Sequence, residues 1–107
     1  MPRESLELKQ FEWDHFNADK IRQKHKVEPR ECEEVFFNYP LVAPDVSHST
    51  IEKRYSALGK TNTGRLLYII FTERKGKIRV ISAWNANKKQ RRLYYENAKE
   101  SEKNTNL

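Results

Sequence analysis

The 107-residue chain predicts one small α+β domain, in which helices pack against an antiparallel sheet. Its length corresponds to about one domain. The first half contains two helix-start signals, an aspartate and a proline, and the second half contains three strand-like runs separated by short turn signals. We expect the domain over residues 1–100 and a polar, disordered tail over 101–107.

One strand and two helices are expected in the first half. Phe11–Asp14 alternates apolar and polar residues, which is the period of a half-buried strand. The carboxylate of Asp14 can accept from free amides and cap a helix over His15–Lys26. Pro29 suits the first position of a second, short helix, because its backbone angle φ is already helical. Asn38 and the proline after it end that helix.

The second half predicts an irregular loop, a three-stranded meander and a last helix. Proline, aspartate and serine in Leu41–Thr50 favour the loop. The strands are expected over Glu52–Lys60, Arg65–Arg74 and Lys77–Trp84, with turns at Asn62-Thr63-Gly64 and Lys75-Gly76. The middle strand is apolar on both faces and is therefore expected at the centre. Either Asn85 or Asn87 caps a helix over Ala86–Lys99. Its expected contacts with the rest of the domain are made by Ala86, Leu93, Tyr94 and Ala98. The predicted order is β-α-α-β-β-β-α.

The net charge of +6 is unevenly divided along the chain. Residues 1–57 have nine basic and eleven acidic side chains, a net charge of −2, whereas residues 58–107 have twelve and four, a net charge of +8. A basic half of one small domain favours an anionic partner, most often a nucleic acid. The alternative is a solvated surface that keeps the protein soluble.

Several classes of protein are excluded by composition. No apolar run approaches the ~18 residues of a membrane span, and no apolar segment follows the N-terminus as in a secretory signal. The three histidines have no metal-ligand spacing, and the single cysteine cannot form an internal disulfide. Cys32 lies on the apolar stripe of a helix, where a buried structural thiol is expected rather than a nucleophile. No membrane partner, no metal and no cofactor are expected, and the location is expected to be cytoplasmic.

Two groups of basic residues are candidates for anion binding. Arg79 interrupts an apolar strand, where an arginine is costly unless it is paired or holds an anion. The alternative for Arg79 is an ion pair with Glu52, Glu73 or Asp14. The last helix has basic residues followed by two tyrosines, which together suit single-stranded RNA, or else form a solvated face.

A series of short segments follows one order along the chain. They are Phe11-Glu12-Trp13-Asp14, Lys24-His25 with Val27, His48-Ser49 with Glu52 and Arg54, Gly59 with Thr61, Gly64-Arg65, Phe71-Thr72-Glu73-Arg74 and Ile78-Arg79-Val80-Ile81-Ser82-Ala83. In this order and spacing the chain resembles the BrnT family of bacterial type II toxins, which are ribonucleases with a RelE-like fold. The resemblance spans roughly residues 11–96.

The resemblance implies a toxin that inhibits translation by cleaving RNA. It also implies a BrnA-like antitoxin with a ribbon-helix-helix DNA-binding region as partner. The toxin–antitoxin complex is expected to repress its own operon, so that operator DNA is contacted only through the antitoxin.

Cleavage of RNA by its own 2′-hydroxyl needs a proton acceptor, a proton donor and cations for the developing charge. The resemblance assigns these catalytic roles to His25, Arg54 and Arg79, with Glu52 as base or orienting group. The expected RNA-binding residues are Arg65, Arg74, Trp84, Lys88, Lys89, Arg91 and Arg92.

Three departures from the family pattern involve four positions. Trp84 follows Ser82-Ala83 where the family has an arginine, Lys26 replaces a glycine, and Asn17 and Ile21 replace a lysine and an asparagine. Trp84 can stack on a base or fill core space. Two alternatives therefore stay open, a catalytically degenerate member that binds antitoxin or RNA without cleavage, and a nucleic-acid-binding module unrelated to toxins.

Overall fold

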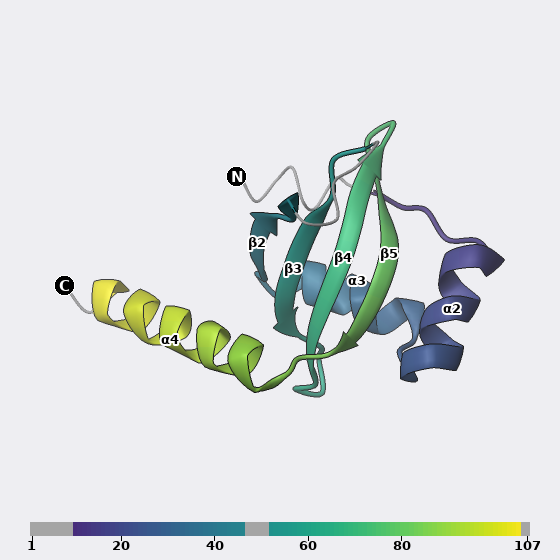
Figure 1. Cartoon of the computed structure of the whole chain (residues 1–107). Helices are drawn as coiled ribbons and strands as arrows, with labels where there is room; N and C mark the ends of the chain where they lie inside the picture. Colours follow the sequence, from purple (N-terminus) through teal and green to yellow (C-terminus); the bar gives the residue numbers. More distant parts are fainter. Residues whose placement is uncertain (1–9, 47–51, 106–107) are drawn as a thin grey trace.

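A five-stranded sheet with three helices makes up the computed structural model, which describes residues 10–46 and 52–105 (Figure 1). The strands lie in the order β1-β5-β4-β3-β2, and every pair is antiparallel except β1 with β5. The α+β class is therefore confirmed. The elements are β1 (Gln10–Phe11), α2 (His15–His25), α3 (Pro29–Phe37), β2 (Leu41–Pro44), β3 (Tyr55–Lys60), β4 (Leu66–Arg74), β5 (Lys77–Asn85) and α4 (Lys88–Thr105).

The start signals of α2 and α3 act as predicted. The Asp14 carboxylate accepts from the backbone N–H groups of Phe16 and Asn17, and the Asn17 side chain accepts from the Asp14 N–H. Pro29 begins α3. The strand expected over Phe11–Asp14 does not continue past Phe11, and Gln10 and Phe11 are the described residues of β1 that pair with β5.

The prediction of an irregular loop over Leu41–Thr50 is wrong for its first four residues. Leu41–Pro44 form strand β2, which pairs antiparallel with β3 from Leu41 opposite Leu58 to Pro44 opposite Tyr55. The proline misled the prediction, although a proline is tolerated on an edge strand because its missing N–H can face away from the sheet. Residues 47–50 of that loop lie outside the described part of the chain.

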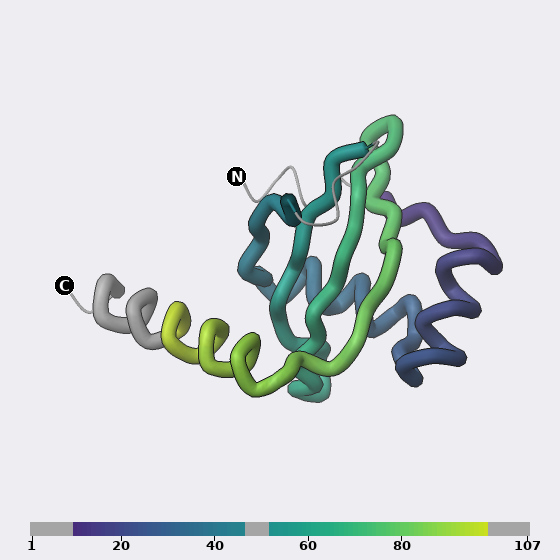
Figure 2. The backbone as a smooth tube through the Cα atoms, in the orientation of Figure 1, coloured from purple at the N-terminus to yellow at the C-terminus, as the bar shows by residue number. Residues whose placement is uncertain are grey.

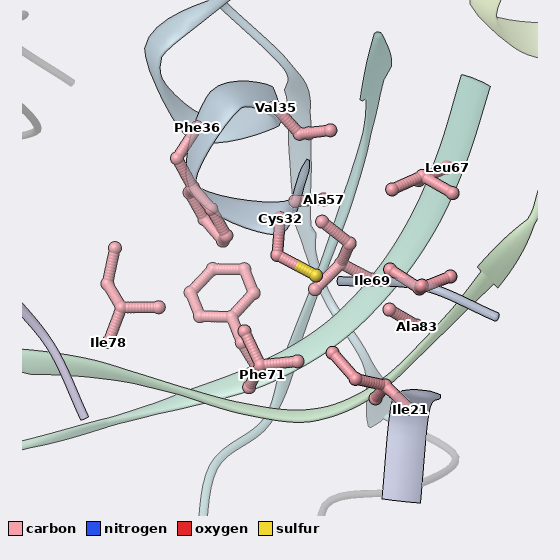
Figure 3. Close-up of a cluster of buried hydrophobic side chains, with 12 residues drawn as sticks. Ile21, Cys32, Val35, Phe36, Ala57, Leu67, Ile69, Phe71, Ile78 and Ala83 are labelled. Atoms are coloured by element: carbon pink, nitrogen blue, oxygen red, sulfur yellow. The ribbon is translucent and has the colours of Figure 1, made fainter. Parts of the chain in front are cut away.

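The main core lies between the sheet and the helices α2 and α3. Figure 3 shows Phe36 and Cys32 of α3 meeting Phe71 and Ile69 of β4. The Phe36 and Phe71 rings make an edge contact with centroids 4.9 Å apart. The central position of β4 is confirmed, since most of its residues are buried.

The last helix runs away from the sheet rather than lying flat on it (Figures 1 and 2). Asn87, one of the two predicted caps, exchanges hydrogen bonds with Gln90. Ala86 and Tyr94 pack against Leu58 and Leu66 in a small second core. The expectation that Leu93 docks the helix is wrong, since Leu93 is 51% exposed. The helix extends to Thr105, into the segment predicted as a polar tail.

Candidate functional site

The second face of the sheet, opposite α2 and α3, contains the candidate residue Trp84. Side chains alternate between the two faces of a strand. Ala57, Ile69 and Ala83 point into the main core, so their neighbours point the other way. Tyr68 of β4 is directly opposite Trp84 of β5 on this second face.

An ionic cluster lies where β4 and β5 approach their connecting turn. Arg79 makes its closest contacts here, from one Nη to Asp14 Oδ2 at 2.9 Å and to Glu12 Oε1 at 3.0 Å. Its other Nη donates to Asp14 Oδ1 at 3.2 Å. The cluster comprises Glu12, Asp14, Glu52, Arg54, Arg74 and Arg79.

The electrostatics of the Arg79–Asp14 pair are reciprocal. The hydrogen bonds from Arg79 lower the pKa of the Asp14 carboxyl, and those to Asp14 raise the pKa of the guanidinium. The Arg79 side chain is only 12% exposed. The ion pair with Asp14, one of the alternatives that the sequence allows, is present. Arg79 therefore ties the start of α2 to β5.

Weaker ion pairs extend the cluster to β3. Arg74 lies 3.4 Å from Glu52 and 3.9 Å from Glu12, and an Arg54 nitrogen lies 4.0 Å from Glu52. These side chains are a third to a half exposed, so each pair is worth little by itself. Three of the four expected catalytic residues thus belong to one network, in which each cation faces a carboxylate.

Arg65, an expected RNA-binding residue, joins three elements at the opposite end of the sheet. It donates to the carbonyls of His25 and Lys26 at the end of α2, to Glu31 Oε1 of α3 at 2.9 Å, and to Asn85 Oδ1 of β5 at 2.8 Å. The guanidinium therefore satisfies helix-terminal carbonyls and an acidic side chain at the same time.

An aromatic cluster, His25, Trp84 and Tyr68, lies near this end. The His25 imidazole is 5.9 Å from the Trp84 ring, and the Trp84 ring is 5.4 Å from that of Tyr68, measured between centroids. All three residues are partly exposed. His25, an expected catalytic residue, thus adjoins the Trp84 ring, which is suited to stacking.

A cavity of about 520 Å³ continues from Tyr68 to the first turns of α4. Lys89, Arg92 and Glu96 line it, and neither cation makes an ion pair with a carboxylate in the described part of the chain. The other expected RNA-binding residues of this helix, Lys88 and Arg91, are exposed beside the cavity rather than lining it.

The structure separates the expected catalytic residues into two places. Arg79 contacts Asp14, which caps the start of α2, whereas His25 is the last residue of that helix. The 11 residues of α2 span about 16 Å. His25 therefore does not join Glu52, Arg54 and Arg79 in one centre. Sequence reasoning missed Tyr68, which the alternation along Leu66–Ile70 places on the face of Trp84.

Cys32 is fully buried in the main core, as expected, and burial raises the pKa of its thiol to about 12. Across residues 10–46 and 52–105, no three histidine, cysteine or acidic side chains gather into a group that could hold a metal ion. No helix in these ranges is long and apolar enough to cross a membrane.

Comparison with protein families identifies the chain's family. The sequence pattern of a family described as "Ribonuclease toxin, BrnT, of type II toxin-antitoxin system" matches residues 13–90. The matched range begins before α2 and ends in the first turn of α4, so it includes the aromatic cluster and every member of the ionic cluster except Glu12. No curated protein matches the chain.

Proposed function

Because the chain belongs to the BrnT family of type II toxin–antitoxin ribonuclease toxins, we propose that it is a metal-independent endoribonuclease that cleaves RNA beside His25. The RNA lies along the aromatic cluster and the first turns of α4. The toxin acts in the bacterial cytoplasm, where cleavage of RNA inhibits translation. A BrnA-like ribbon-helix-helix antitoxin neutralises it and supplies the contacts to operator DNA.

The observation that carries this proposal is the contact between His25 and Trp84. An imidazole can accept or donate a proton near neutral pH. The rings of Trp84 and Tyr68 offer flat surfaces on which bases stack. The Trp84 ring centroid lies 5.9 Å from that of His25 and 5.4 Å from that of Tyr68. The adjoining cavity contains two cations, Lys89 and Arg92, for phosphates. Proton transfer, stacking and charge are thus available on one surface.

In the proposed reaction the 2′-oxygen of one nucleotide attacks the adjacent phosphorus. The 2′-hydroxyl loses its proton to a base, the bond from phosphorus to the 5′-oxygen breaks, and that oxygen takes up a proton. The products are a 2′,3′-cyclic phosphate and a free 5′-hydroxyl. The His25 imidazole serves one of the two proton transfers, and Lys89 and Arg92 stabilise the charge that develops on the phosphate oxygens.

The ionic cluster is a second candidate for the reacting centre, because it joins Glu52, Arg54 and Arg79. Its cations already face carboxylates, which oppose the approach of a phosphate. We therefore assign Arg79 and Glu52 to the positioning of α2, β4 and β5. The variant Arg54→Gln distinguishes the two candidate centres. Its kcat is expected to stay nearly unchanged if cleavage takes place beside His25, and to fall if it takes place in the ionic cluster.

The experiment compares His25→Ala with His15→Ala on a defined RNA and on the same sequence with 2′-deoxyribose throughout. His15, at the start of α2, is a matched histidine away from the aromatic cluster. His25→Ala is expected to lower kcat by about 10²- to 10⁴-fold, as for loss of a proton-transfer group. His15→Ala retains kcat, EDTA has no effect, and the deoxy substrate binds without being cleaved.

Equal kcat values for the two histidine variants, or loss of cleavage in EDTA, would contradict the proposal. A wild-type chain that binds RNA and never cleaves it would instead support the catalytically degenerate alternative. In that case Trp84→Arg tests whether a cation at this position restores cleavage.

A further inference from the structure

The outer edge of β5 is fastened to α2 by two side chains. On this edge, β1 pairs with β5 only as far as Ile78. Further along, the pairing of β5 with β4 is irregular, because Ser82 lies opposite Ile70 but Val80 lies opposite the next residue, Phe71. The carbonyls of Val80 and Ile81 at this irregularity accept from Asn17 Nδ2 at 3.0 Å and from Lys20 Nζ at 3.1 Å. The ammonium of Lys20 is thereby held at the sheet edge.

Lys20 has positive neighbours and no ion pair to a carboxylate among the residues that the structure describes. Partial burial, together with the charges of Lys24 and Arg54, lowers the pKa of its ammonium. A carbonyl oxygen is a weak partner for a half-buried charge. An anion beside Lys20 would satisfy that charge without breaking the bond to Ile81, because an ammonium has three donors.

A shallow cavity of about 150 Å³ lies beside Lys20. Its lining is Phe16, Asn17, Lys20, Arg79, Val80 and Ile81. The charge of Arg79 is matched by Asp14 and Glu12, so Lys20 supplies the cation that is available to a ligand. Phe16 contributes an aromatic ring that is 71% exposed at the start of α2.

We propose that this cavity binds one nucleotide of the RNA substrate, with the Lys20 ammonium on a phosphate and the Phe16 ring stacked on the base. The inference rests on the proposed ribonuclease function and adds a binding site to it. Nine residues of α2 separate Phe16 from His25, about 13 Å along the helix axis. The bound nucleotide therefore lies beyond the two that flank the cleaved bond, and the RNA follows α2.

The first measurement is binding, which does not depend on cleavage. The probe is a labelled all-2′-deoxy decanucleotide, and its Kd is measured at several salt concentrations. Lys20→Gln keeps a donor for the Ile81 carbonyl but removes the charge. It is expected to raise Kd about fivefold to tenfold at low salt and to reduce the salt slope by about 0.7, the value for one phosphate contact on a single strand.

Two further variants separate the roles of charge and ring. Lys20→Arg retains the cation and should bind like the wild type, whereas Phe16→Ala should weaken binding by at least about fivefold, in line with loss of one base stack. Phe16→Tyr keeps a stacking ring and the wild-type Kd. Lys77→Gln is the matched control, because it removes one exposed cation from β5 outside the cavity.

Cleavage then gives a length test. Lys20→Gln should raise KM for a long RNA without lowering kcat, and leave a dinucleotide substrate unaffected, because a dinucleotide does not reach the cavity. The site is overturned if Lys20→Gln and Lys77→Gln share the same Kd and salt slope. It is also overturned if Phe16→Ala binds the decanucleotide with the wild-type Kd and inorganic phosphate by itself binds at Lys20. Failure of His25→Ala to stop cleavage would contradict the catalytic proposal and leave this binding result standing.

Discussion

Two sets of basic residues, the arginines of the sheet and the first basic residues of α4, differ in what their charges face. Arg65 and Arg79 each donate to several partners within the protein and include a carboxylate among them. Lys89 and Arg92 on α4 line a cavity and face no carboxylate within ion-pair distance among the described residues. Basic character in a sequence therefore does not by itself mark a ligand site. Internal pairing decides which cations are structural and which can receive an anion.

The largest effect that this comparison predicts is on stability, at Arg65. Arg65→Ala should lower the free energy of unfolding by about 3 kcal/mol, because it leaves Glu31 and the end of α2 without their donor. Chemical denaturation measures the change. Arg91→Ala on the exposed face of α4 is the control, with a change within about 0.5 kcal/mol. If both variants lost the same free energy of unfolding, Arg65 would be no more structural than an exposed arginine of α4.

The next effect concerns Trp84 and binding. Trp84→Leu keeps apolar volume but lacks a flat ring, so it should weaken RNA binding by about 1–3 kcal/mol, whereas Trp84→Phe retains most of the affinity. Fluorescence anisotropy with the deoxy analogue measures both. If leucine and phenylalanine at this position bind RNA equally well, Trp84 fills space rather than stacking.

A smaller effect is expected on α4. The double variant Lys89→Gln/Arg92→Gln should raise the Kd for RNA and flatten its salt dependence by about 1.4, or about 0.7 for each lost phosphate contact. Its thermal midpoint should stay that of the wild type, because neither side chain makes an ion pair with a carboxylate in the described part of the chain. An unchanged salt dependence would place the RNA elsewhere on the protein.

The smallest effect is a pH dependence at Asp14. Asn is also a good helix cap, so Asp14→Asn removes mainly the ion pair with Arg79. The folded-state pKa of Asp14 lies below its ordinary value of 3.8, so its contribution is present above that value and is lost as the pH falls through the lowered pKa. The variant should melt below the wild type at pH 7 and approach it in strong acid. A difference that persists unchanged into acid would exclude the ion pair as its cause.

Local signals predicted much of this fold. The cap at Asp14, the start of α3 at Pro29 and the central position of β4 each depend on a few neighbouring residues or on one apolar run. Strand β2 could not be predicted in this way, because its strand character comes from pairing with β3 rather than from its own composition.

The site was less predictable, because it depends on contacts between distant residues. Arg79 and Asp14 are 65 positions apart, and Arg65 and Glu31 are 34 apart. The sequence positions of the basic residues do not show which of them form such contacts within the protein. Lys20 reaches its place through the irregular register of β5, which no sequence period shows. Trp84 was recognised as a departure from the family pattern, but its neighbours His25 and Tyr68 emerge only from the fold.

The central claim is that cleavage takes place beside His25 and that Arg79 holds the fold together. The most direct measurement is kcat on one RNA for His25→Ala and Arg79→Gln, each well below its melting temperature. We predict that His25→Ala melts like the wild type and loses kcat, and that Arg79→Gln melts lower and retains kcat. Loss of kcat in Arg79→Gln at an unchanged melting temperature, with normal cleavage by His25→Ala, would contradict the account.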